Sequence, residues 1–130
     1  MATRSMIAQT LSDGTVRSIY CHWDGYPSNN GAILHRFYNT EEQVTALLDG
    51  GDLSTLAADI KDNERIQSDY MRFPGQRFAT ADEAVEYYTE SWCEWFYKFE
   101  DGIWWARDRK SDWRSLVGIL EDAREEVDEP

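Results

Sequence analysis

The chain has 130 residues, and its 13 lysines and arginines against 25 aspartates and glutamates give a formal net charge of −12. This length predicts a single domain, residues 1–130, and the acidic balance argues against direct nucleic-acid binding, which requires cations to displace the counterions of phosphates. The sequence has no bilayer-length apolar run and begins with no signal-like segment, so we expect a cytoplasmic protein without membrane contact.

Aromatic residues supply 14% of the chain, which predicts a packed core rather than a disordered acidic chain. The two cysteines, Cys21 and Cys93, lack CxxC spacing, and only two histidines are present. We therefore expect reduced, half-buried thiols and no zinc site. Neither a phosphate-binding glycine motif nor a calcium-loop pattern occurs, so we expect no cofactor and no metal.

The first predicted element is a β-hairpin. Residues 6–11 and 15–23 are rich in β-branched and aromatic side chains, and Asp13-Gly14 between them supplies the positive φ angles of a tight turn. A two-residue loop at Asp13-Gly14 and a three-residue loop that begins at Ser12 both fit this pattern.

Two short helices are expected after a loop at residues 24–31. In the first, helical spacing turns four apolar residues inward and two polar residues outward: Ile33, Leu34, Phe37 and Tyr38, against His35 and Arg36. Thr40 and Gln43 have the capping-box spacing that begins the second helix, and Gly50-Gly51 ends it. Its apolar side consists of Val44, Leu47 and Leu48. We expect one helical turn over residues 52–60 and a mostly irregular segment over 61–77, with a turn at Pro74-Gly75.

The second half of the sequence predicts a helix, a β-hairpin and a last helix, in this order. Thr80 and Glu83 repeat the capping-box spacing, and the helix carries Val85, Tyr88 and Trp92 on its buried side. A two-residue turn at Asp101-Gly102 pairs Phe99 with Trp104. One face of this hairpin is expected to be core and comprises Trp95, Tyr97, Phe99, Trp104 and Ala106, whereas Phe96, Lys98, Trp105 and Arg107 share the other. Ser111 is expected to cap the last helix, which carries Trp113, Leu116, Leu120 and Val127.

These elements predict an α+β fold. The two antiparallel β-hairpins contribute to one sheet, and three to four helices cover one of its faces. The order of elements does not reveal how the two hairpins join.

The densest group of chemically active side chains follows the first hairpin. We single out His22, Asp24 and Tyr26 as candidate ligand-binding residues, because an imidazole, a carboxylate and an aromatic edge at the end of a strand can grip a small polar ligand. Two alternatives stay open. One is a hydrolase in which Asp24 orients His22 as a general base, and the other is a structural corner with its aromatic residues in the core.

The last helix is the most acidic part of the chain. Its carboxylates can imitate the phosphates that a nucleic-acid-binding protein recognises, and Trp105 is expected to face outward beside Arg107 as an anchor for a partner. We therefore predict a partner-binding surface of six residues: Trp105, Arg107, Glu121, Asp122, Glu125 and Glu126. The alternative is a solvated acidic helix end beside a covered sheet face.

The first 56 residues contain the core motif Ile19-Tyr20-Cys21-His22-Trp23-Asp24-Gly25-Tyr26-Pro27-Ser28, together with Ala2–Ser5, Asp13–Val16, Gly31, Leu34, Tyr38–Glu41 and Gly51–Leu56. In these residues the chain resembles a group of small uncharacterised proteins from bacteriophages, prophages and plasmids. The resemblance implies a habitat in mobile genetic elements rather than an activity.

Small acidic proteins of mobile elements are often inhibitors of host systems, and this analogy guides the functional expectation. We expect a non-enzymatic protein in the cytoplasm of a host bacterial cell. It would bind and inhibit a host nucleic-acid-handling defence complex, as anti-CRISPR and anti-restriction proteins do. The alternative is a small-ligand or nucleotide-binding protein built around His22, Asp24 and Tyr26. The oligomeric state stays open.

Overall fold

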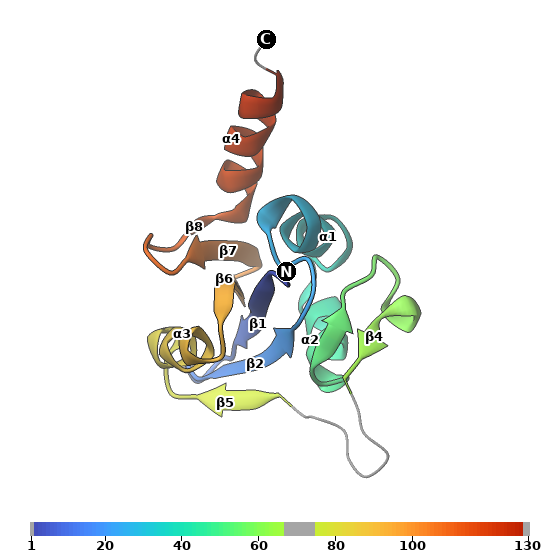
Figure 1. Ribbon diagram of the computed structural model, residues 1–130. Coiled ribbons are helices and arrows are strands. Elements are labelled where there is room, and N and C mark those ends of the chain that lie inside the picture. Colours follow the sequence, from blue (N-terminus) through green and yellow to red (C-terminus); the bar gives the residue numbers. More distant parts are fainter. Residues whose placement is uncertain (1, 67–74, 129–130) are drawn as a thin grey trace.

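A parallel pairing between two strands from opposite halves of the chain forms the middle of the structure. β1 (Arg4–Thr10) pairs in parallel with β6 (Cys93–Glu100), and each has its own antiparallel hairpin partner, β2 (Val16–Cys21) and β7 (Ile103–Asp108). Within the described part of the chain, the result is a mixed eight-stranded sheet in the order β4-β3-β2-β1-β6-β7-β8, with β5 paired to β2 outside that path (Figure 1). The four short strands are β3 (Leu53–Thr55), β4 (Glu64–Arg65), β5 (Gln76–Phe78) and β8 (Arg114–Ser115).

Helices cover both faces of this sheet. The computed structural model describes residues 2–66 and 75–128, with side chains as far as residue 122. α1, α2 and the beginning of α4 pack on one face, whereas α3 packs on the other. The predicted α+β fold, with two antiparallel hairpins in one sheet under three to four helices, is confirmed. The helices are α1 (Ala32–Phe37), α2 (Glu41–Asp49), α3 (Ala81–Glu90) and α4 (Leu116–Asp128), with shorter helical turns η1 (Pro27–Gly31) and η2 (Ile60–Asp62).

The prediction that helices cover only one face is wrong, because β1 is buried on both sides. Its five central residues, Ser5 to Gln9, are all less than 3% exposed. Successive side chains of a strand point to opposite faces, so Ile7 joins the core under α2 while Met6 and Ala8 join a second core under α3. The first core also contains Leu34, Leu47, Tyr97, Trp104 and Leu116, and the second contains Val85, Tyr88, Cys93 and Phe96.

Both hairpins follow their local turn sequences. The first has the three-residue loop that begins at Ser12, since Leu11 donates to the Thr15 carbonyl at 2.8 Å and Gly14 has a φ of 87°. The second has the predicted two-residue turn, in which Asp101 and Gly102 both have positive φ and Phe99 pairs with Trp104.

Two of the predicted helix starts, at Thr40 and Thr80, are also present. Thr40 and Gln43 form both hydrogen bonds of a capping box. Thr80 accepts the amide hydrogen of Glu83 at 3.2 Å, but the Glu83 carboxylate bonds the amide of Ala79 instead of that of Thr80. The apolar side of α2 is buried as predicted, at Val44, Leu47 and Leu48.

The middle of the chain differs from the prediction. Residues 53–55 form β3 rather than a helical turn, because Leu53 is fully buried beside Cys21 of β2. Short strands β4 and β5 lie within the region predicted as irregular, and Pro74 of the predicted turn lies outside the described residues. In α1, His35 and Arg36 are exposed as predicted, but Phe37 is 39% exposed because the helix ends there.

Two errors occur at the ends of the later helices. α3 ends at Glu90, and Trp92 has a φ of 71°, so its indole leaves the buried side and is 70% exposed. Ser111 does not cap α4. Its amide donates to the Asp108 carboxylate at 2.7 Å, and its hydroxyl accepts the Asp108 amide at 3.2 Å. Hydrogen bonding from Ser111, that of its amide first, holds the pKa of Asp108 below its usual value. α4 begins at Leu116 after Ser115, whose hydroxyl accepts the amide of Gly118, and Trp113 lies before the helix in the second core.

Among the described residues, no helix combines the length and the apolar character that crossing a membrane requires.

Both cysteines are free and buried, which predicts slow reaction with thiol reagents. Burial raises the pKa of the Cys93 thiol to about 12 and raises that of Cys21, so both are almost entirely protonated near pH 8. We expect the native chain to show no rapid labelling by a chromogenic disulfide reagent, and the urea-unfolded chain to react at both thiols. Rapid labelling of either thiol in the native chain would contradict this packing.

Candidate functional site

The predicted ligand-binding segment forms a tight corner between β2 and α1. The amides of His22 and Trp23 donate to the carbonyls of Leu53 and Ser54, each at 3.0 Å, and continue the path of β2 along β3. Asp24 then adopts a left-handed conformation with a φ of 57°, which turns the chain across the end of the sheet. The corner is therefore built by backbone contacts.

Gly25 is one of the residues through which the corner contacts the central strands. Its amide donates to the Thr3 carbonyl at 2.8 Å, and its carbonyl accepts the Tyr97 hydroxyl at 2.6 Å. A β-carbon at this position would lie 2.7 Å from the β-carbon of Ser5, so a larger residue does not fit without displacement. The glycine in the motif is explained by this close approach.

Asn30 is the buried polar centre of the corner and was not singled out from the sequence. Its amide nitrogen lies within hydrogen-bond distance of Ser5 Oγ at 3.2 Å and Cys21 Sγ at 3.3 Å, and its side-chain oxygen accepts from Asn29 at 3.0 Å. Its backbone amide donates to the Asp24 carbonyl at 3.3 Å. A buried amide with every group in contact fixes one conformation of the loop.

Among the described residues, no hydrogen bond or ion pair joins the three predicted ligand-binding side chains. The Nδ1 atom of His22 pairs with the Tyr20 hydroxyl at 2.8 Å, and its ring lies edge-on to Trp23. The Asp24 side chain is exposed and forms no hydrogen bond or ion pair with His22 among the described residues. Tyr26 is 41% exposed. The arrangement lacks the base–carboxylate contact that the hydrolase reading needs.

The predicted partner-binding residues lie on two sides of the molecule. Trp105 and Arg107 share the sheet face of Phe96, on which α3 packs, whereas α4 contacts the opposite core through Leu116. Trp105 is half-buried with a buried indole nitrogen, and Arg107 lies 5.9 Å from the ring of Trp113.

On α4, which extends away from the sheet in Figure 1, Glu121 and Asp122 are exposed. Asp122 forms an ion pair of 2.6 Å with Arg114, so part of this charge is already neutralised. The side chains of Glu125 and Glu126 lie outside the described part of the chain.

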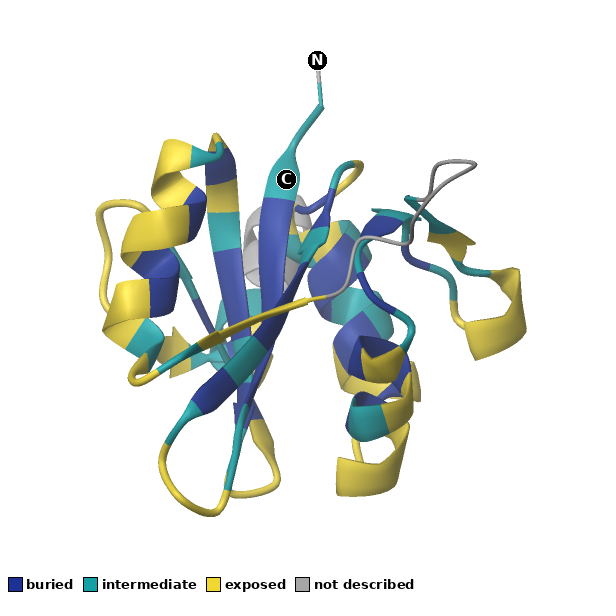
Figure 2. Ribbon diagram, turned by 90° about the horizontal axis from the view of Figure 1, so that it is seen from below, coloured by how far each residue is buried: buried dark blue, intermediate teal, exposed yellow. Residues whose placement is uncertain are grey.

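A different acidic surface comprises the outer side of α3 and the residues directly after this helix. We call it the α3 acidic face: Asp82, Glu83, Glu86, Glu90, Trp92 and Glu94. All six residues are exposed, α3 contains no lysine or arginine, and none of these carboxylates belongs to an ion pair among the described residues. Figure 2 shows α3 at the left with its exposed residues turned away from the sheet. The i, i+4 spacing of Asp82, Glu86 and Glu90 could have revealed this face.

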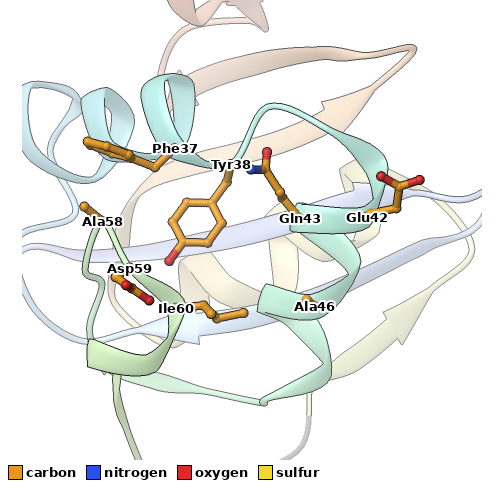
Figure 3. Close-up of a pocket in the computed structure, with 8 residues that line it drawn as sticks. All are labelled: Phe37, Tyr38, Glu42, Gln43, Ala46, Ala58, Asp59 and Ile60. Carbon is orange, nitrogen blue, oxygen red and sulfur yellow. The ribbon is translucent and has the colours of Figure 1, made fainter.

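An apolar groove of about 590 Å³ lies between α1, α2 and η2 (Figure 3). Phe37 and Ile60, both about 40% exposed, are its main apolar walls, and the Tyr38 hydroxyl beneath them bonds the Ala57 carbonyl at 2.7 Å. Glu42 points away from the groove in Figure 3. The groove can accept an apolar side chain.

Comparison with protein-family models, with curated proteins and with solved structures found no match to this chain. The resemblance of the first 56 residues to phage and plasmid proteins therefore stays a prediction.

Replacing Tyr97 with Phe tests the structural role of the corner. The substitution removes the only side-chain donor to the buried Gly25 carbonyl among the described residues, so we expect the free energy of unfolding to fall by about 1–3 kcal/mol. The matched control is Tyr26→Phe, at an exposed position, with an expected change within about 0.5 kcal/mol. Urea unfolding measures both, and equal effects would contradict the assignment of Tyr97 as the anchor.

Proposed function

We propose that this protein is a non-enzymatic inhibitor from a phage or another mobile element, which binds a basic surface of a host nucleic-acid-handling defence complex of the CRISPR or restriction type. The observation that carries the proposal is the α3 acidic face, with its exposed carboxylates beside an exposed indole. A surface of this kind complements lysines and arginines that otherwise bind phosphates. The charge of −12 supports the same kind of partner through long-range attraction.

The backbone conformation and the exposure of Trp92 also support the proposal. A left-handed conformation is costly for a residue with a β-carbon, and helix ends of this geometry usually carry glycine. Here the position carries the most exposed large apolar side chain among those of the described residues, at 70%. An exposed tryptophan at the edge of a charged surface is a typical anchor of a protein interface.

The α3 face is favoured over the corner at His22 as the functional surface. At the corner, polar groups of Gly25 and Asn30 form hydrogen bonds within the protein. By contrast, no ion pair among the described residues neutralises the carboxylates of α3. No catalytic pairing is present at the corner, so the proposal is inhibition by binding.

Neutralising three carboxylates tests the role of charge. We expect the wild-type chain to restore plating of a targeted phage on cells that carry a restriction or CRISPR system. The triple variant Glu86→Gln, Glu90→Gln, Glu94→Gln should bind the complex roughly tenfold more weakly, because each exposed pair contributes up to about 1 kcal/mol. The control Glu42→Gln, Asp62→Asn, Glu64→Gln removes the same charge away from α3. Equal losses in both variants would show a net-charge effect, and the absence of rescue by the wild type in every such system would overturn the proposal.

The substitution Trp92→Gly separates binding from folding. Glycine suits the left-handed position, so we expect the free energy of unfolding to stay within about 1 kcal/mol of the wild type or to rise. We expect rescue of the phage to fall at least about tenfold, because an aromatic anchor of an interface contributes about 1 kcal/mol or more. A variant that keeps both its stability and full inhibition would exclude Trp92 from the interface.

A further inference from the structure

A small hollow of about 310 Å³ lies where the end of α3 meets β2 and β5. It is distinct from the corner at His22–Asp24 and from the apolar groove of Figure 3. Three tyrosines, one carboxylate and two neutral polar side chains line it: Tyr20, Asp52, Gln76, Tyr87, Tyr88 and Ser91. Tyr87 and Ser91 also lie next to Glu86 and Glu90, so the hollow adjoins the α3 acidic face.

Asp52 is a half-buried carboxylate that has no positive partner among the described residues. Its Oδ1 atom accepts the backbone amide of Tyr20 at 2.9 Å, and no other described group donates to the carboxylate. None of the ion pairs between described residues includes it. Burial raises the pKa of Asp52 and the Tyr20 amide opposes that effect. The carboxylate is thus partly dehydrated, with Oδ2 free to accept a donor.

The aromatic walls are held in place by hydrogen bonds at their hydroxyl groups. The Tyr88 hydroxyl pairs with Ser18 Oγ at 2.9 Å, the Tyr87 hydroxyl accepts from Gln76 at 3.2 Å, and the Tyr20 hydroxyl pairs with His22. The rings of Tyr87 and Tyr88 meet edge to face, with their centroids 5.0 Å apart. A hollow with fixed walls loses little entropy when it is occupied.

We propose that this hollow binds the cationic end of an arginine side chain, with Asp52 as the counter-ion and the tyrosines as aromatic walls. A guanidinium carries a charge that compensates the carboxylate, several N–H donors for its free oxygen, and a flat face that packs against aromatic rings. An anion is repelled by Asp52, and an apolar group leaves the dehydrated carboxylate unpaired. The charge and the lining together select an organic cation.

The source of the guanidinium is a basic segment of the protein partner, and this part of the inference rests on the proposed function. Glu86 and Glu90 are exposed and lie on either side of Tyr87 in the sequence. Further basic residues of the partner segment would contact these two carboxylates. A free arginine-like metabolite offers the same chemistry without those additional contacts.

The test is a titration of the full chain with N-acetyl-arginine amide, followed by the backbone amide signals of Tyr20, Asp52 and Tyr88 in NMR spectra. We expect saturable shifts, and no such shifts with N-acetyl-citrulline amide, which has nearly the same shape without the charge. Asp52→Asn keeps an oxygen that can accept the Tyr20 amide, and it should weaken binding at least about tenfold. Tyr87→Leu is the second variant should Asp52→Asn fail to fold, and Asp62→Asn is the control that should bind like the wild type. Equal response to the arginine and citrulline amides, or unchanged binding in both hollow variants, would overturn the proposal.

An arginine-containing basic peptide distinguishes the two sources. We expect it to bind more than about tenfold tighter than the single amide, and to lose that gain in the Glu86→Gln, Glu90→Gln variant, which should still bind the amide normally. Equal affinities for peptide and amide would overturn the assignment to a protein segment. Binding of the amide by a chain that rescues no phage would contradict the proposed function and leave the hollow supported. Rescue of the phage without any binding of the amide would support the proposed function and overturn the assignment of the hollow as an arginine site.

Discussion

The parallel pairing of β1 with β6 is the contact on which the rest of the structure depends. It joins two hairpins that local turn sequences can form separately, and it places an apolar strand, Met6 to Ala8, at the centre of the sheet. A strand that is buried on both faces requires a packed layer on each face of the sheet. α2 packs on one face and α3 packs on the other. The same pairing brings Tyr97 of β6 to the Gly25 carbonyl and thereby anchors the corner after β2.

This arrangement explains why the most distinctive motif of the sequence is not the best candidate for function. The corner at residues 22–31 satisfies its polar groups internally, and Asn30 and Gly25 leave little freedom for a ligand to use. α3, by contrast, buries only Ala84, Val85 and Tyr88 and presents acidic residues to solvent. The fold constrains the motif residues and leaves the outer side of α3 free to serve a partner.

Features with a local cause could be predicted from the sequence. The Asp-Gly turns and the Thr40 capping box depend on neighbouring residues, and the structure has them where the sequence indicated. β3, the anchor at Tyr97 and the join between hairpins depend on residues that are distant in the chain, which no spacing reveals. The sequence wrongly predicts that Trp92 lies on the buried side of the helix, because the helical period ends with α3 at Glu90. Asp52 was overlooked because its significance comes from tyrosines of other elements.

The central claim is that the protein meets its partner through α3 and the residues directly after it. Hydrogen–deuterium exchange of the chain, free and bound to the host complex that we propose it inhibits, tests this most directly. The account predicts that binding slows exchange at residues 86–94, with smaller changes in the corner at residues 22–31 and in α4. Protection confined to that corner or to α4, with unchanged exchange across α3, would contradict it.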